Sequence, residues 1–318
     1  MYRLIARGSI LRSSNSSSLQ LGLAKLSSHL VVALVALVVI GGATRVMEAG
    51  LACPDWPLCY GSFLPGRHMN IQVFLEWFHR LDAFLIGIAL LVQFIFSFIK
   101  RNILPKSIVW VNALLLLLVG IQGGLGALTV TQLLPPDVVT AHLILALSLV
   151  AIVSSLSQRL IQSDCKPAPP WWRIMGGISI VLVICQSLIG GKMATTWASR
   201  KCLVQGSSCH LLDIHRYFAI PVTTFILAFI IISLFAGGWV RSQWPFYILI
   251  FSLILLQILL GLSTVHLGLS KPIVTILHQL DGALLVATFS SLIARRPYIS
   301  EEIFFGIKDK SFMEACHG

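Results

Sequence analysis

The chain has 318 residues, of which 57% are hydrophobic and 11% are charged, and its formal net charge is +11. A soluble domain carries roughly a quarter charged residues, so the composition excludes an ordinary soluble protein and indicates an integral membrane protein. Nucleic-acid binding is not indicated, because no basic groove motif or aromatic-interleaved basic patch accompanies the positive charge. Basic loops on one side of a membrane explain the surplus better.

The chain begins with a segment, 1–26, that is basic, rich in serine and free of acidic residues. This composition is typical of an organelle transit segment, and equally of a cytoplasmic tail on the basic side of a membrane. We interpret the segment as a cytoplasmic tail. A bacterial cell membrane is therefore the expected location, with an organelle inner membrane as the alternative.

Eight apolar stretches follow, and each is long enough to cross a hydrocarbon core, which takes about 20 residues of helix. They are 27–47, 74–98, 107–128, 138–160, 173–193, 213–236, 245–266 and 273–294. The two ends and the loops on their side hold 15 Lys and Arg, against six in the opposite, outer loops. Because cytoplasmic loops are enriched in these residues, both termini are expected to face the cytoplasm.

The two halves of the chain repeat one pattern. Ile40-Gly41-Gly42 reappears as Ile189-Gly190-Gly191, and the third span of each half carries glutamine and glycine, Gln122 to Gly126 against Gln257 to Gly261. Four spans per half make the repeats parallel. The expected fold is an all-α integral membrane protein of eight transmembrane helices, arranged as two tandem four-helix bundles related by a pseudo-twofold axis along the membrane normal.

This duplication predicts the organisation of the domains. The N-terminal half covers 27–161 and the C-terminal half 173–294. The proline-rich stretch 162–172 is expected to link them, and 295–318 is expected to form a second cytoplasmic tail.

Four histidines carry the strongest functional signal. His79 and His142 are 63 residues apart, as are His215 and His278, and a shift of 136 maps one pair onto the other. Each lies a few residues into a span that starts on the outer side, where ionisable residues are costly and usually functional. One such histidine could simply hydrogen-bond across a helix interface. Four at duplicated positions indicate axial ligands of haem iron.

Zinc is the inorganic alternative to haem. It fits less well, because the spans offer no third and fourth ligand beside either histidine pair, as a His-x-x-x-His or Glu-x-x-His set would.

An acidic residue precedes one histidine of each half. Glu76 lies three residues before His79 and shares its helix face, while Asp213 stands shortly before His215. Both acids also suit a helix start, where the dipole favours negative charge. The longer Glu side chain belongs to the half with the longer outer loop, which indicates that this half handles a substrate.

An arginine directly follows the same two histidines. Arg80 and Arg216 could pair with the propionates of a haem, since a guanidinium matches the geometry of a carboxylate. The alternative is that these side chains reach out to the membrane interface, as Arg near helix ends commonly does.

Each half has two cysteines in its first outer loop, Cys53 and Cys59 in one and Cys202 and Cys209 in the other. The outer side of such a membrane is oxidising, which favours a local disulfide in each loop. The sequence leaves open whether these pairs are redox-active or structural.

Taken in order, these motifs resemble those of the haem A synthase (CtaA/Cox15) family. The resemblance rests on the helix end Gly41-Gly42-Ala43-Thr44-Arg45, the loop Cys53-Pro54-Asp55-Trp56-Pro57-Leu58-Cys59, the Glu76-x-x-His79-Arg80 signature and the four spaced histidines, and it spans roughly 27–294. It implies an oxidoreductase that converts the C8 methyl of haem O to a formyl group, giving haem A for cytochrome oxidase.

The resemblance also implies roles for individual residues. His215 and His278 would ligate a resident haem b, and His79 and His142 would lie at the site of the substrate haem. Glu76 and a Cys53–Cys59 disulfide would take part in activity, whereas a Cys202–Cys209 disulfide would stabilise its loop.

The implied partners are haem O as substrate, membrane lipid, the farnesyltransferase that forms haem O, and the machinery of cytochrome oxidase assembly. The sequence leaves open a homo-oligomer. Two other functions remain as alternatives: a di-haem b-type membrane electron carrier without methyl oxidation, and a transporter, suggested by the internal repeat.

Overall fold

The computed structural model describes residues 2–161, 168–207 and 209–297, with side chains from residue 18 onward. Within these residues the regular structure is helical, and eight helices are long and apolar enough to cross a membrane. The long helices are α1 (Tyr2–Val46), α2 (Ile71–Ile99), α3 (Lys106–Thr131), α4 (Pro136–Ile161), α5 (Pro170–Thr195), α7 (His210–Phe235), α9 (Trp244–His266) and α10 (Pro272–Ala294). The predicted number and order of spans are confirmed.

Three short helices were not expected. They are η1 (Gly66–His68) in the first outer loop, α6 (Ala198–Gln205) in the second, and α8 (Gly238–Ser242) between α7 and α9. They lie in stretches whose apolar content is too small to mark them in the sequence.

The first span begins before the expected residue 27, because residues that precede it are buried against other helices. Leu23 and Ala24 are buried, and Ser28 Oγ lies 2.7 Å from Ser157 Oγ of α4. Serine does not interrupt the helix here, since the Ser28 hydroxyl donates to the Ala24 carbonyl one turn earlier. The end of the predicted cytoplasmic tail is therefore part of the first membrane helix.

The predicted linker is shorter than expected, because Pro170–Trp172 form the first turn of α5. Pro170 suits this place, since a helix start needs no N–H from its first residue. The rest of the expected linker lies largely outside the described residues, as does residue 298 onward of the expected C-terminal tail.

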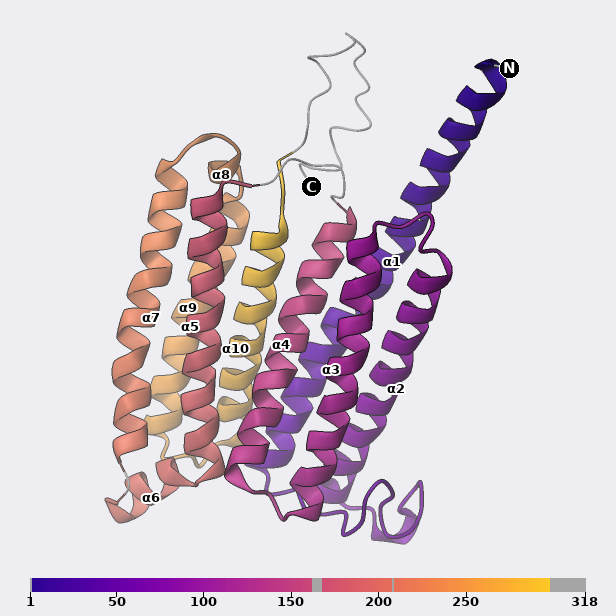
Figure 1. Ribbon diagram of the computed structural model, residues 1–318. Coiled ribbons are helices and arrows are strands. Elements are labelled where there is room, and N and C mark those ends of the chain that lie inside the picture. Colours follow the sequence, from indigo (N-terminus) through magenta and orange to yellow (C-terminus); the bar gives the residue numbers. More distant parts are fainter. Residues whose placement is uncertain (1, 162–167, 208, 298–318) are drawn as a thin grey trace.

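The contacts between helices follow the same pattern in both halves. In the first half α1 contacts α2 and α4, and α3 contacts α2 and α4; in the second half α5, α7, α9 and α10 contact one another in the same pattern. Between the halves, α1 contacts α10, α4 contacts α5, and α4 contacts α10 (Figure 1). Exchanging the halves leaves this set of pairs unchanged, which is consistent with the expected pseudo-twofold axis.

Glycines bring the central helices of the two halves together. A Cβ on Gly191 of α5 would lie 2.7 Å from Leu143 Cδ2 of α4, and a Cβ on Gly42 of α1 would clash with the Gln279 amide of α10. Close backbone approach through small residues is the usual means of helix association in lipid. The repeated glycine pair therefore joins the halves at equivalent places.

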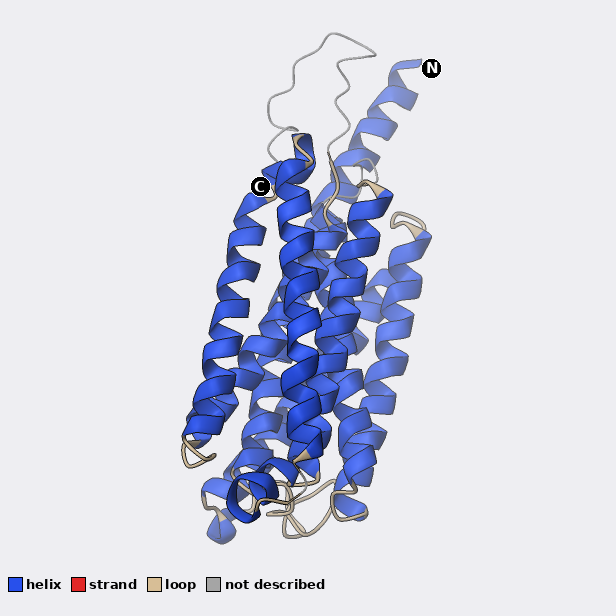
Figure 2. Ribbon diagram, turned by 90° about the vertical axis from the view of Figure 1, so that its left-hand side faces the viewer, coloured by secondary structure: helices blue, strands red, loops and turns tan. Residues whose placement is uncertain are grey.

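The two ends of the bundle differ. The start of α1 and the end of α10 lie at one end, while the loop 47–70 and α6 lie at the other (Figure 1). A view turned by 90° shows the same separation, with the loops gathered below a bundle of nearly parallel helices (Figure 2). The end with the loop 47–70 and α6 is called the loop end below.

Away from the loop end, the cores of the halves have diverged. The first half buries a polar chain in which Ser27 donates to Gln93 and Gln93 donates to Asn112, at 3.2 and 2.6 Å. At the matching place the second half buries Tyr247, whose hydroxyl accepts from Trp172 Nε1 at 2.9 Å. Divergence here contrasts with the symmetry that survives at the loop end, which indicates that function maintains that symmetry.

Candidate functional site

The four histidines lie in the first turns of helices that begin at the loop end: His79 in α2, His142 in α4, His215 in α7 and His278 in α10. All four are half-buried. Their helices start at the same end of the bundle (Figure 1), so all four lie toward the loop end.

Each histidine ring lies against a glycine of the neighbouring odd-numbered span in its half. A Cβ on the glycine would stand 2.9 to 3.4 Å from Cε1 of the ring. The pairs are Gly41 with His79, Gly126 with His142, Gly190 with His215, and Gly261 with His278. These glycines make room for the imidazoles.

His215 and His278 approach each other directly, with ring centroids 6.4 Å apart and ring planes at 74°. Bonds between a metal and imidazole nitrogen are about 2 Å long, so two imidazoles on opposite sides of one ion have centres about 6 Å apart. The spacing of this pair therefore fits two axial ligands of one iron atom.

One ring nitrogen is unpaired in three of the four histidines. Nδ1 is buried without a hydrogen-bond partner in His79, His142 and His278, and Nδ1 of His215 lies 3.3 Å from Gln186 Nε2. Unpaired buried polar atoms are rare and call for an explanation. Iron ligation is one, since a ligand uses one ring nitrogen for the metal and leaves the other for a nearby acceptor.

Three glutamine side chains donate hydrogen bonds to the backbone carbonyls of histidines. Gln122 Nε2 donates to the His142 carbonyl at 3.1 Å, and Gln186 Nε2 donates to the His215 carbonyl at 2.8 Å. Gln257, with its amide oriented to satisfy both neighbours, donates to the His278 carbonyl at 3.0 Å. Sequence reasoning missed these contacts, although a recurring Gln-x-x-x-Gly on α3, α5 and α9 was available as a signal.

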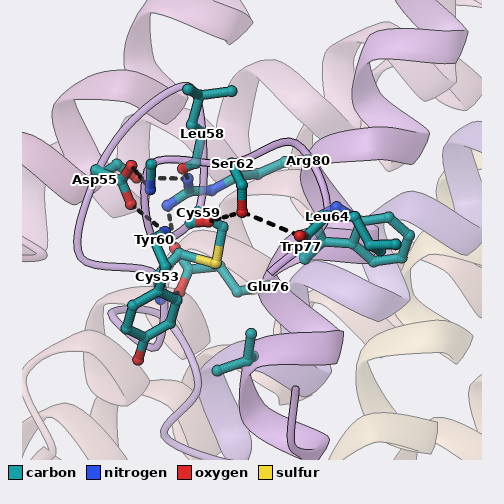
Figure 3. Close-up of a disulfide and its surroundings, with 12 residues drawn as sticks. Cys53, Asp55, Leu58, Cys59, Tyr60, Ser62, Leu64, Glu76, Trp77 and Arg80 are labelled. Carbon is teal, nitrogen blue, oxygen red and sulfur yellow. Dashed lines mark hydrogen bonds and ion pairs between the residues drawn. A yellow bond between two sulfur atoms is a disulfide. The ribbon is translucent and has the colours of Figure 1, made fainter. Parts of the chain in front are cut away.

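Glu76 is buried, with 4% of its surface exposed, and both of its carboxylate oxygens are engaged. Oε2 accepts from the Cys53 N–H at 2.8 Å, and Oε1 pairs with Arg80 Nη2 at 2.5 Å (Figure 3). The side chain therefore joins α2 to the first outer loop, on the same helix face as His79.

Arg80 completes this attachment of the loop. Its Nη1 donates to the Asp55 carbonyl at 2.7 Å and to the Leu58 carbonyl at 2.6 Å (Figure 3). The guanidinium was expected to face a haem propionate; in the structure at least three of its donors are directed at the loop and at Glu76.

Both expected cysteine pairs form disulfides, Cys53–Cys59 and Cys202–Cys209. Cys53 and Cys59 are fully buried. Between them the Asp55 carboxylate accepts from the N–H groups of Tyr60 and Gly61 at 2.6 and 2.7 Å. The disulfide loop is thus a closed, internally bonded unit held on α2.

Asp213 does not occupy the place of Glu76. With the shift of 136 that relates the histidines, Glu76 corresponds to Leu212, which is buried, whereas Asp213 is exposed. One residue turns a side chain by about 100° around a helix, so the two acids face different surroundings. The expected Glu–Asp equivalence is therefore wrong in register, and only the first half has a buried acid at this position.

Arg216 is exposed and makes no hydrogen bond or ion pair with any described residue. Its guanidinium is thus available to an outside anion, in contrast to that of Arg80.

A buried acid that the sequence reasoning missed is Asp281, three residues after His278 in α10. It accepts from Gln257 Nε2 at 2.7 Å through Oδ2, while Oδ1 has no partner. Its signal was an acidic residue inside a span, which is uncommon in lipid.

A cavity of about 820 Å³ lies near the start of α5 and the end of α7, away from the loop end. Pro169, Arg173, Trp239 and Pro297 are among the residues that line it, and no histidine does. It is separate from the histidine site.

The fold and the site define a class of protein: a multi-pass membrane protein with two repeated pairs of histidines at one end of paired four-helix bundles. Residues 24–290 match the family model COX15-CtaA, described as cytochrome oxidase assembly protein. The match covers most of the chain, and the chain belongs to this family.

Several bacterial proteins are similar to this chain in sequence. A protein of Shewanella oneidensis is 27% identical over 313 residues, covering 80% of this chain and 91% of the relative. One of Sphingopyxis alaskensis is 25% identical over 324 residues, covering 83% and 89%. One of Bradyrhizobium diazoefficiens is 31% identical over 204 residues, covering 54% and 56%. All three are named heme A synthase.

Proposed function

We propose that this protein is a haem A synthase, an oxidoreductase that converts the C8 methyl of haem O to a formyl group for cytochrome oxidase. Family membership and the name carried by its relatives support this function. The observation that carries it is the pair of histidine sites, each built from two imidazoles that lie against glycines.

The C-terminal half, 173–294, would hold a resident haem b between His215 and His278. The 6.4 Å separation of their rings supports this assignment. A haem bound there supplies one-electron redox chemistry. The chain contributes fixed ligands: glycines shape the ring pockets, and Gln186 and Gln257 tie the two histidine helices to α5 and α9. Arg216 is free to pair with a propionate.

The N-terminal half, 27–161, would bind haem O between His79 and His142. Glu76 and Arg80 fix the disulfide loop on α2 beside this pair, so the loop would cover the substrate and exclude water. With Arg80 engaged by the loop, its role is to position that loop and Glu76. A propionate contact is then a secondary use of its remaining donors.

Glu76 is the residue we assign to the reaction itself. Its carboxylate lies on the face of His79 and would take up a proton as the methyl is oxidised. The N–H of Cys53 and the guanidinium of Arg80 hold the carboxylate in place for that task.

The membrane setting completes the proposal. Eight apolar helices make the chain a multi-pass membrane protein, and the distribution of basic residues supports both termini lying in the cytoplasm of a bacterial cell. The haem O-forming farnesyltransferase would suit as a partner, because it could pass on a poorly soluble product. A homo-oligomer is compatible with the apolar outer faces of the helices.

The test is conversion of haem O by the pure, full-length protein, supplied with an electron acceptor of the membrane. Pigments are extracted and separated, and haem A is expected to form. A protein that shows the spectrum of bound haem but yields no haem A would instead be a di-haem b-type electron carrier. One without any chromophore would exclude both functions.

A further inference from the structure

The helix that faces each histidine repeats a second position, four residues before the glycine. Gln122 precedes Gly126, Gln186 precedes Gly190, and Gln257 precedes Gly261 by this interval. In α1 the residue four before Gly41 is Leu37. Three of the four sites thus have a glutamine where the His79 site has a leucine.

The three glutamines make the same hydrogen bond to their histidines. Each amide nitrogen donates to the backbone carbonyl of the histidine itself, at 2.8 to 3.1 Å. Each bond therefore crosses between two helices at the level of the ring and fixes their relative height and rotation. Leucine has no donor, so the His79 carbonyl lacks this attachment to α1.

The C-terminal pair is held more firmly for a further reason. Gln257 also donates to Asp281 of α10 at 2.7 Å, which adds a second bond between α9 and the helix of His278. In the matching first half, the shift of 136 places Leu145 where Asp281 stands. Through these glutamines the second half therefore ties both histidine helices to the facing spans, and the first half ties only that of His142 in this way. The helix of His79 is joined instead to the loop 47–70, by Glu76 and Arg80.

We propose that Gln122, Gln186 and Gln257 are positioning residues for the iron ligands, and that Leu37 leaves the His79 backbone without the interhelical bond that holds the other three. A haem held by His79 and His142 then exchanges faster than one held by His215 and His278. This inference rests on the proposed function for the identity of the ligand as haem. The contacts within the chain are what assign the faster haem exchange to the N-terminal half.

The test measures haem release from the full-length protein in lipid nanodiscs. Both sites are loaded with iron protoporphyrin IX, an excess of haem-free globin captures what dissociates, and absorbance follows the transfer. Wild type is expected to show a fast and a slow phase. His79→Ala should remove the fast phase and His278→Ala the slow one, which assigns each phase to a half.

Leu37→Gln is the decisive variant, because it should slow the fast phase. Interhelical hydrogen bonds in membranes correspond to about a three- to tenfold change in an equilibrium or rate. A misfolded variant would lose haem faster, so misfolding cannot explain slower release of haem. Ala36→Gln is the matched control: it places the same side chain on the adjacent, exposed position of α1 and should leave both phases unchanged.

The reciprocal variants are Gln186→Leu and Gln257→Leu, which should speed the slow phase by a similar factor and alter the low-spin electron paramagnetic resonance signal of its haem. Gln122→Leu should speed the fast phase. Unchanged release from Leu37→Gln, or equal rates at both sites in wild type, would overturn the proposal.

The proposed function can fail separately from this inference. If wild type releases haem in the two expected phases but forms no haem A, the function is wrong and the inference stands. If wild type forms haem A while Leu37→Gln releases haem at the wild-type rate, the inference alone is wrong.

Discussion

At the residue scale, the four histidines share a ring environment but differ in how they are attached. All four rings rest on glycine, while only His215 and His278 stand in direct ring contact among the described residues. That contact is the reason to place a tightly bound haem in the second half and an exchanging one in the first.

Replacing the histidines tests this assignment. His215→Ala or His278→Ala is expected to abolish the low-spin b-type spectrum of the purified protein, because each removes one of two axial ligands. His79→Ala and His142→Ala should keep that spectrum and lose haem A formation. A normal spectrum in both of the first two variants would move the resident haem to the other half.

Glu76 is the residue on which the reaction should depend most. Glu76→Gln keeps the shape and the acceptor for the Cys53 N–H but removes the charge opposite Arg80. We expect it to retain the resident haem and to slow haem A formation by about a hundredfold or more, the usual effect of losing a general base. Pigment extraction would show haem O or a hydroxylated intermediate.

Asp213→Asn is the control for charge at a helix start. Asp213 is exposed and one residue out of register with Glu76, so its loss should change turnover by less than about twofold. Equal losses in the two variants would mean that both acids serve only their helices.

At the element scale, helix contacts decide whether the rings fit. A Cβ at position 190 would lie 3.0 Å from His215 Cε1, so Gly190→Ala must displace the ring by a few tenths of an ångström. Overpacking of this kind costs about 1–3 kcal/mol. We expect resident haem to bind roughly tenfold more weakly, which a titration with iron protoporphyrin IX would measure.

Gly177→Ala, on the same helix, is the matched control for helix propensity. A Cβ there meets nothing within 4 Å, and alanine is the better helix former. Haem affinity should be unchanged and thermal stability equal or higher. A similar loss of haem in both variants would show that flexibility of α5, and not the space under His215, is what Gly190 provides.

The elements themselves were largely predictable from sequence. Runs of about 20 apolar residues have one stable form in lipid, since a helix satisfies its own backbone. The start of the first span was not predictable in this way: Leu23 and Ala24 precede the expected start at residue 27 and are nevertheless buried in the bundle. Tertiary contact extends the span.

At the scale of the whole molecule, the basic residues predict the orientation of the bundle. The start of α1 and the end of α10 lie together, opposite the disulfide loops (Figure 1). Reporter domains that fluoresce only in the cytoplasm should therefore be bright at either terminus and dark when inserted into the loop 47–70. A bright reporter in that loop would reverse the topology and place both disulfides in a reducing compartment.

The sequence by itself determined the eight spans, the duplication and the four histidines, because hydropathy and a fixed repeat are properties of the chain alone. It also indicated Glu76 and the cysteine pairs, and it suggested Asp213 as a counterpart that the helix register does not support. Only the tertiary structure decided what these residues face. It showed that Arg80 is bound to the disulfide loop and that glutamines tie three histidine helices to their neighbours. Such contacts join positions far apart in sequence, and they depend on the rotation of each helix, which hydrophobic patterning leaves free when lipid surrounds the bundle.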